Sequence, residues 1–109
     1  MKPAHLRPQA EQDLVAAARW YADQGGADLG GRFFDAARQA LQTVESAPSI
    51  GSPVLGKNIG IPGLRTWAVD TFPVRWFYFE RDVHIDVVRL LGDRQDIAVI
   101  LAADPPQAG

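Results

Sequence analysis

The chain has 109 residues, of which 47% are hydrophobic, and a formal net charge of −2 at pH 7. This length predicts a single domain over residues 1–109, and the absence of cysteine excludes disulfide frameworks and thiolate metal sites. The balance of 11 basic and 13 acidic side chains argues against a domain that mainly binds nucleic-acid phosphates. Because no apolar run approaches the roughly 18 residues of a membrane span and residues 1–9 lack a signal-like apolar segment, we expect a cytoplasmic protein without a membrane partner.

The first part of the chain predicts a short strand and two helices. Residues 2–6 include a proline, which suits an edge strand. Residues 7–26 predict a helix that starts at Pro8 and is stopped by two glycines, with apolar residues at helical spacing. Residues 28–48 predict a second helix with an apolar stripe of Leu29, Phe33, Ala37, Leu41 and Val44. The link between the helices is short, so we expect an antiparallel hairpin.

The second part predicts a small sheet. Residues 49–63 are rich in Gly and Pro and are expected to form a loop. Three segments rich in β-branched and aromatic residues predict an antiparallel meander: 63–70, 73–80 and 83–91. A short last helix is expected within residues 94–103, followed by a frayed tail at 104–109. The predicted fold is α+β: an N-terminal short strand and an antiparallel helical hairpin packed on a small antiparallel β-meander, with a short C-terminal helix.

Few residues suggest chemistry. His5 and His84 lie on separate predicted strands without a pattern of further ligands, so we expect no metal. Neither a phosphate-binding loop nor a nucleophile elbow is present, and we expect no cofactor. The aromatic run at residues 76–79 alternates across the sheet, which favours core packing over a base-stacking platform.

Four arginines on or after the predicted strands are the strongest functional candidates: Arg65, Arg75, Arg89 and Arg94. Strand alternation predicts that Arg65 shares a face with Trp67 and Val69, and that Arg89 shares one with Val87 and Leu91. An arginine between core-facing residues indicates either a buried ion pair or a guanidinium presented to a partner. The candidate acidic partners are Asp70, Asp86 and Asp93.

The order of these elements, with three motifs, resembles the ParE/RelE superfamily of toxins from bacterial type II toxin–antitoxin systems. The motifs are Gly-Leu-Arg at 63–65, Trp-Phe-Tyr at 76–78 and Arg-Leu-Leu-Gly-Asp-Arg-Gln-Asp at 89–96. The resemblance covers nearly the whole chain. Two positions depart from the usual pattern, since Gly92 replaces a histidine and Gln95 replaces an arginine.

The resemblance implies one of two activities. RelE-like members are ribosome-dependent messenger-RNA endonucleases that need basic side chains at the scissile phosphate and commonly a tyrosine near the C-terminus. Arg65 and Arg94 match two of the basic positions, but Ile100 stands where the tyrosine is expected, and Lys57 is alone where RelE-like members are lysine-rich. ParE-like members are associated with inhibition of DNA gyrase by protein–protein contact, and this reading fits the chain better.

We therefore expect a toxin that arrests growth by inhibiting gyrase and serves plasmid stabilization, acting as an inhibitor rather than as an enzyme. Its expected partners are gyrase and a ParD-like antitoxin in a toxin–antitoxin hetero-oligomer, with no direct nucleic-acid contact. The antitoxin's C-terminal segment is expected to use a groove or an open strand edge beside the hairpin. Arg94 is expected to project from the sheet end, after Gly92. A ribosome-dependent endonuclease and a degenerate toxin that only binds its antitoxin remain as alternatives.

Overall fold

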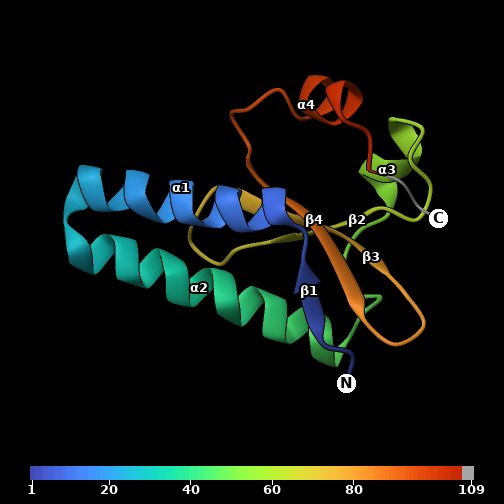
Figure 1. Cartoon of the computed structure of the whole chain (residues 1–109), viewed down its shortest axis with the longest axis horizontal. Coiled ribbons are helices and arrows are strands. Elements are labelled where there is room, and N and C mark those ends of the chain that lie inside the picture. Colours follow the sequence, from blue (N-terminus) through green and yellow to red (C-terminus); the bar gives the residue numbers. More distant parts are fainter. Residues whose placement is uncertain (107–109) are drawn as a thin grey trace.

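The computed structural model describes residues 1–106. Figure 1 shows a long helical hairpin packed along a small sheet, with two short helices near the C-terminus. In chain order the elements are β1 (Ala4–Leu6), α1 (Pro8–Gly25), α2 (Ala27–Ser46), α3 (Val54–Asn58), β2 (Arg65–Ala68), β3 (Val74–Glu80), β4 (Ile85–Gly92) and α4 (Ile97–Ala103). The predicted α+β arrangement is confirmed. Residues 104–106 of the predicted frayed tail form no helix or strand, and residues 107–109 lie outside the described residues.

The hairpin is tight because small residues stand at its turn and at its contact surface. Pro8 opens α1, where its missing N–H costs nothing. Gly26 is the only residue between α1 and α2, and its φ of 90° is one that glycine adopts readily. A β-carbon at Gly30 of α2 would lie 2.9 Å from the β-carbon of Ala22 and 3.0 Å from the carbonyl oxygen of Ala18. Glycine facing alanine therefore lets the two helices approach closely.

The sheet has the strand order β1-β4-β3-β2. The strands β2, β3 and β4 form the predicted antiparallel meander. The N-terminal strand β1 pairs with β4 in parallel, so the first and the last strand of the chain lie side by side (Figure 1). This pairing places the start of α1 directly beside the middle of β4.

The sheet is buried on both faces. Along β3, Trp76 and Tyr78 point into a core formed with the helical hairpin, which we call the hairpin core. Phe77 and Phe79 point the opposite way, into a second core formed with α3 and α4, which we call the C-terminal core. All four rings are 2% exposed or less. The aromatic run therefore serves packing on two faces and offers no ring surface for a nucleic-acid base.

The segment predicted as a loop contains a helix. Val54–Asn58 form the single turn α3, which brings Leu55 into the C-terminal core. Gly56 lies within this turn and packs so closely on the carbonyls of Ile61 and Leu64 that a side chain would not fit. The glycine that suggested a loop is needed for close packing of a short helix.

A β-bulge changes the predicted faces of β4. Val87 pairs with Tyr78 and Arg89 pairs with the preceding residue Phe77, so Val88 is an extra residue on β4. Val87 consequently lies in the hairpin core and Leu91 in the C-terminal core. The prediction that Arg89 shares one face with both residues is wrong, because simple alternation fails across the bulge.

Candidate docking site

Arg89 is held by an ion pair with a partner on α1. Its Nε and Nη2 donate to the two carboxylate oxygens of Asp13 at 2.7 and 3.1 Å. Asp13 also accepts from the backbone N–H of Leu90 at 3.0 Å. The side chains of Arg89 and Asp13 are only 19% and 12% exposed. This contact fixes α1 on β4, and it leaves Arg89 little freedom to bind a partner.

Asp13 was absent from the predicted partners of Arg89. A signal was nevertheless present, because Asp13 follows the buried Ala10 by three residues and so lies on the packed face of α1.

Arg65 and Arg75 are also engaged within the chain. Arg65 donates from Nη1 to the carbonyl oxygens of Ser49 and Gly51 at 3.2 and 2.7 Å. Arg75 pairs with the predicted candidate Asp93 at 3.1 Å. The first contact fastens the loop before α3 to β2, and the second fastens β3 to the turn after β4.

The turn that carries Arg94 is well ordered by hydrogen bonds. Gln95 accepts from the backbone N–H of Gly92 through its Oε1 at 2.7 Å and donates its own N–H to the Gly92 carbonyl at 3.0 Å. Asp93 donates its N–H to the carbonyl of Pro73 at 2.9 Å. Gln95, which departs from the usual motif, thus closes the turn and presents Arg94 from a fixed backbone.

Arg94 is exposed and lacks an ion pair among residues 1–106. The two nearest acidic residues in sequence have other partners: Asp93 binds Arg75, and Asp96 caps α4 by accepting from the N–H of Val99 at 3.2 Å. A local ion pair of Arg94 with Asp93 or Asp96 is therefore not formed. Of the four candidate arginines, this is the one whose charge is left for another molecule.

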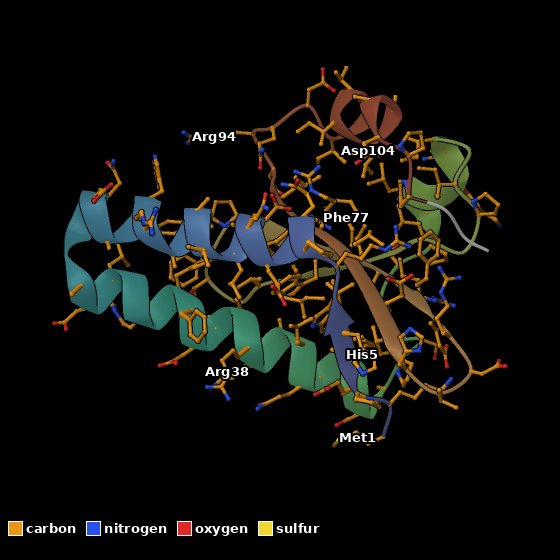
Figure 2. All side chains as sticks on the ribbon, in the orientation of Figure 1. Met1, His5, Arg38, Phe77, Arg94 and Asp104 are labelled. Atoms are coloured by element: carbon orange, nitrogen blue, oxygen red, sulfur yellow. The ribbon has the colours of Figure 1, made fainter. Side chains whose placement is uncertain are left out.

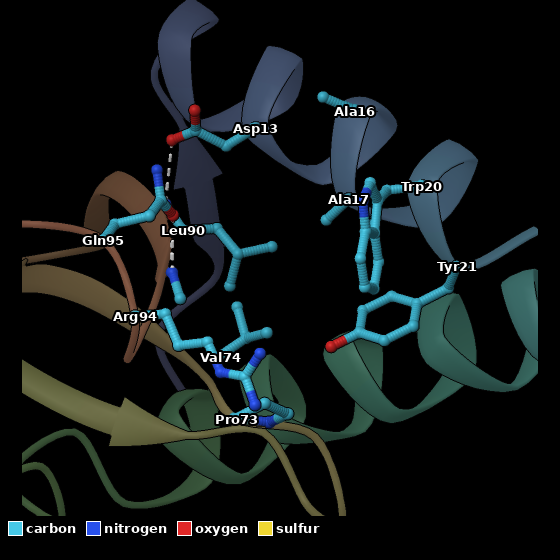
Figure 3. Close-up of a pocket in the computed structure, with 11 residues that line it drawn as sticks. Asp13, Ala16, Ala17, Trp20, Tyr21, Pro73, Val74, Leu90, Arg94 and Gln95 are labelled. Carbon is cyan, nitrogen blue, oxygen red and sulfur yellow. Dashed lines mark hydrogen bonds between the residues drawn. The ribbon is translucent and has the colours of Figure 1, made fainter. Parts of the chain in front are cut away.

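Arg94 lies at a pocket of about 580 Å³ between α1 and the end of the sheet. We call it the Arg94 pocket. Figure 3 shows the Trp20 and Tyr21 rings along one side and Arg94 with Val74 along another. Its lining residues are Asp13, Ala16, Ala17, Trp20, Tyr21, Pro73, Val74, Leu90, Gly92, Arg94 and Gln95.

The aromatic wall of the pocket is partly fixed and partly exposed. Tyr21 stacks on Phe33 at 4.8 Å between ring centroids and meets Phe72 edge-on at 4.9 Å. Trp20 contacts Tyr21 edge-on at 5.0 Å but is 57% exposed. Burial raises the pKa of the Tyr21 hydroxyl, and the positive charge of Arg94 opposes this rise. The site thus combines an anchored ring, an exposed indole and one cation.

The basic side chains proposed for a nuclease do not converge. Arg65 pairs with Tyr78 on β3, whereas Gly92, next to the Arg94 turn, pairs with Val74 four residues earlier. Tyr78 and Val74 mark two levels along β3 that are roughly 13 Å apart at the usual rise per residue of a strand. The guanidinium of Arg65 is moreover bound to carbonyls of a loop at the α3 side. Ile100, at the position expected for a catalytic tyrosine, packs against the C-terminal core.

The two histidines, predicted on separate strands, lie side by side. The rings of His5 and His84 stack with centroids 4.9 Å apart, because β1 pairs in parallel with β4. Within residues 1–106, no three His, Cys, Asp or Glu side chains gather as a metal site would require.

No helix in this same part of the chain combines the length and the apolar character needed to cross a membrane.

Both edges of the sheet are partly closed by the chain itself. At β1, Ala4 donates its N–H to the Glu45 carboxylate at 2.7 Å. At β2, Thr66 exchanges two backbone hydrogen bonds with Ser52, each of 3.0 Å. An added strand would have to displace these contacts, so the Arg94 pocket is the more accessible of the two predicted docking features.

Comparisons with known proteins agree with this fold. Residues 4–97 match the model of a family described as "ParE toxin of type II toxin-antitoxin system, parDE". A chain of the solved structure "Chromosomal ParDE TA system from P. aeruginosa" is similar with a TM-score of 0.72 and 17% identity, over 84% of this chain and 96% of that chain. The comparison with curated proteins finds no similar sequence. The family match extends over most of the chain, which therefore belongs to the ParE toxin family of type II toxin–antitoxin systems.

Proposed function

We propose that this toxin inhibits DNA gyrase by protein–protein contact and that a ParD-like antitoxin neutralises it. The observation that carries the proposal is the position of Arg94, which forms no ion pair within residues 1–106 and stands on a hydrogen-bonded turn at a pocket that the exposed Trp20 also lines. Arginine, with its planar donor fork, and tryptophan are both common anchors of protein interfaces. This arrangement suits binding to a protein surface.

A ribosome-dependent endonuclease is supported less well. Cleavage through the ribose hydroxyl needs basic and acid–base side chains within hydrogen-bond reach of one phosphate. In this toxin Arg65, Arg75 and Arg89 bind carbonyls or carboxylates of the chain itself. These three arginines stabilise the fold through those contacts. Arg94 alone does not make a general acid–base pair.

The proposed target can be tested by comparing two assays on the same purified toxin. We expect inhibition of gyrase supercoiling and no toxin-dependent cuts of messenger RNA in cell-free translation analysed by primer extension. Arg94→Ala is expected to weaken gyrase inhibition about tenfold, the effect of losing roughly 1.4 kcal/mol of binding. The fold should be kept, because Arg94 has no ion pair in the described chain.

Arg38→Ala is the matched control. Arg38 is an exposed arginine on the outer side of α2, across the hairpin from Arg94 (Figure 2). Its removal changes the net charge equally but should leave the inhibition curve unchanged. Codon-dependent cuts by the wild-type toxin, without an effect on gyrase, would instead establish the endonuclease.

A further inference from the structure

We infer that the Arg94 pocket binds one apolar side chain of the antitoxin together with a neighbouring Asp or Glu carboxylate, which pairs with Arg94. The inference rests on the proposed neutralisation by an antitoxin and adds to it the place and the chemistry of the contact. Three features of the pocket support it: its apolar wall, its uncompensated charge and its free hydroxyl.

The wall of the pocket is suited to an apolar side chain. Ala16 and Ala17 contribute only methyl groups from α1, and Val74 and Leu90 contribute aliphatic side chains from the sheet. Trp20 borders this space with more than half of its surface exposed. Covering Trp20 removes a large apolar area from water, which favours an occupant with an aliphatic or aromatic side chain.

The charge of the pocket selects an acidic neighbour. Asp13 is the acidic side chain among the lining residues, and it already binds both Arg89 and the N–H of Leu90. Its negative charge is compensated by Arg89, so the charge of Arg94 is the one left over at the pocket. A partly desolvated guanidinium is best paired by a carboxylate, which accepts two parallel hydrogen bonds from its fork.

The hydroxyl of Tyr21 adds a further donor. It points into the pocket toward Arg94 (Figure 3) and has no hydrogen-bond partner among residues 1–106. The stacking of Tyr21 on Phe33 and Phe72 fixes the ring, so the hydroxyl has a defined position. Because burial raises its pKa, the hydroxyl stays protonated and can donate to an incoming carboxylate oxygen or backbone carbonyl.

The inference also says how neutralisation occurs. An antitoxin segment in this pocket covers Arg94 and Trp20, the same side chains that are proposed to contact the target. The antitoxin then blocks the toxin by occupying its contact surface, and no change of the toxin's conformation is required.

A double-mutant cycle tests the carboxylate. The probe is the protein encoded by the gene next to this one, with each Asp and Glu of its C-terminal half replaced singly by Asn or Gln. We expect Arg94→Ala to weaken binding of the unmodified probe about tenfold in isothermal titration calorimetry. One acidic position of the probe should weaken binding of the wild-type toxin similarly and have no further effect on Arg94→Ala, since coupled partners are not additive.

Two further variants separate charge from geometry. Arg94→Lys keeps the charge but not the planar fork, so an intermediate affinity is expected. Arg38→Ala should bind as the wild type does, which shows that net charge alone does not set the affinity.

The emission of Trp20 should shift to shorter wavelength when the probe binds, and this shift should be lost in Trp20→Phe.

The failures of the two proposals are distinguishable. If the probe binds the wild-type toxin but no acidic position couples to Arg94, the inference about the pocket is wrong, while neutralisation by an antitoxin survives. If Trp20 keeps its emission in a complex that forms, the pocket is not the contact. If the probe does not bind the wild-type toxin at all, neutralisation by this antitoxin and the inference about the pocket are both overturned.

Discussion

At the scale of single residues, Asp86 on β4 is held between two arginines from different parts of the chain. Its carboxylate accepts from Nε and Nη2 of Arg7 at 2.9 and 2.8 Å and from Nη2 of Arg81 at 2.8 Å. Burial alone would raise the pKa of Asp86. The hydrogen bonds and charges of the two arginines outweigh burial, and together they hold the pKa below its ordinary value of 3.8.

Asp86→Asn is expected to lower the free energy of unfolding at pH 7 by about 2 kcal/mol, because two guanidinium groups lose their charged acceptor. A lowered pKa contributes stability above the ordinary value of 3.8, and this contribution is lost as the pH falls through the folded-state pKa. The difference between wild type and variant should therefore narrow from pH 7 to pH 3. Urea denaturation at the two pH values measures it.

The control for Asp86→Asn is Asp82→Asn. Asp82 is exposed and lies just before β4, so its loss removes the same charge without breaking the arginine contacts. It should change stability by less than about 0.5 kcal/mol at either pH. A gap between Asp86→Asn and wild type that widens in acid would contradict the assigned direction of the pKa.

The residue contacts show where the sequence is informative. Arginines flanked by core positions indicated ion pairs, and Arg89 forms one, but with Asp13 rather than with a predicted candidate. The candidate Asp93 binds Arg75, which was not one of these flanked arginines. Asp86 was also a candidate, but it binds Arg7 and Arg81 instead. Such pairings join residues up to 79 positions apart, and spacing along a strand carries no information on contacts between distant elements.

At the scale of elements, α4 helps to cover the face of the sheet that lies opposite the helical hairpin. Leu101 is 1% exposed in the C-terminal core, beside Phe77, Phe79 and Leu91. Leu101→Ala is expected to destabilise the protein by about 3 kcal/mol through lost burial and a cavity. Chemical denaturation followed by tryptophan fluorescence at constant pH measures this loss.

Val99→Ala provides the comparison within the same helix. Val99 is 61% exposed, so its truncation should cost less than about 0.5 kcal/mol. Both substitutions place alanine in α4 and therefore share its high helix propensity. Equal stabilities of the two variants would mean that α4 does not belong to the cooperatively folded core.

The elements that local pattern determines were predicted best. The hairpin and the three-stranded meander follow from apolar periodicity and short connections, and both are confirmed. The helix α3 was missed because Gly56 and the neighbouring prolines resemble a loop, while its stability comes from packing on Ile61 and Leu64. The parallel pairing of β1 with β4 and the bulge at Val88 depend on non-local contacts, which periodicity does not encode.

At the scale of the whole molecule, the sheet is covered on both faces and restrained at both edges, so the Arg94 pocket stands out as an accessible apolar site. The pocket exists because α1 extends past the end of the sheet while β4 stops at Gly92 (Figure 1). No single element predicts this hollow. Arg94 was singled out from the sequence, but Trp20 and Tyr21 were not, because they lie on α1, some 70 residues away in the chain.

A ligand that binds only the folded toxin must raise its melting temperature, which gives a test of the antitoxin that does not depend on the target. At an antitoxin concentration 100-fold above Kd the stabilisation is about 2.7 kcal/mol, and at about 4 °C per kcal/mol this amounts to a shift of roughly 10 °C. Arg94→Ala, with a Kd about tenfold higher at the same concentration, should gain only about 1.4 kcal/mol, or roughly 6 °C. Differential scanning calorimetry with the product of the neighbouring gene gives both values, and Arg38→Ala should retain the full shift. Equal shifts for wild type and Arg94→Ala would remove Arg94 from the antitoxin interface, and the absence of any shift for wild type would remove that partner altogether.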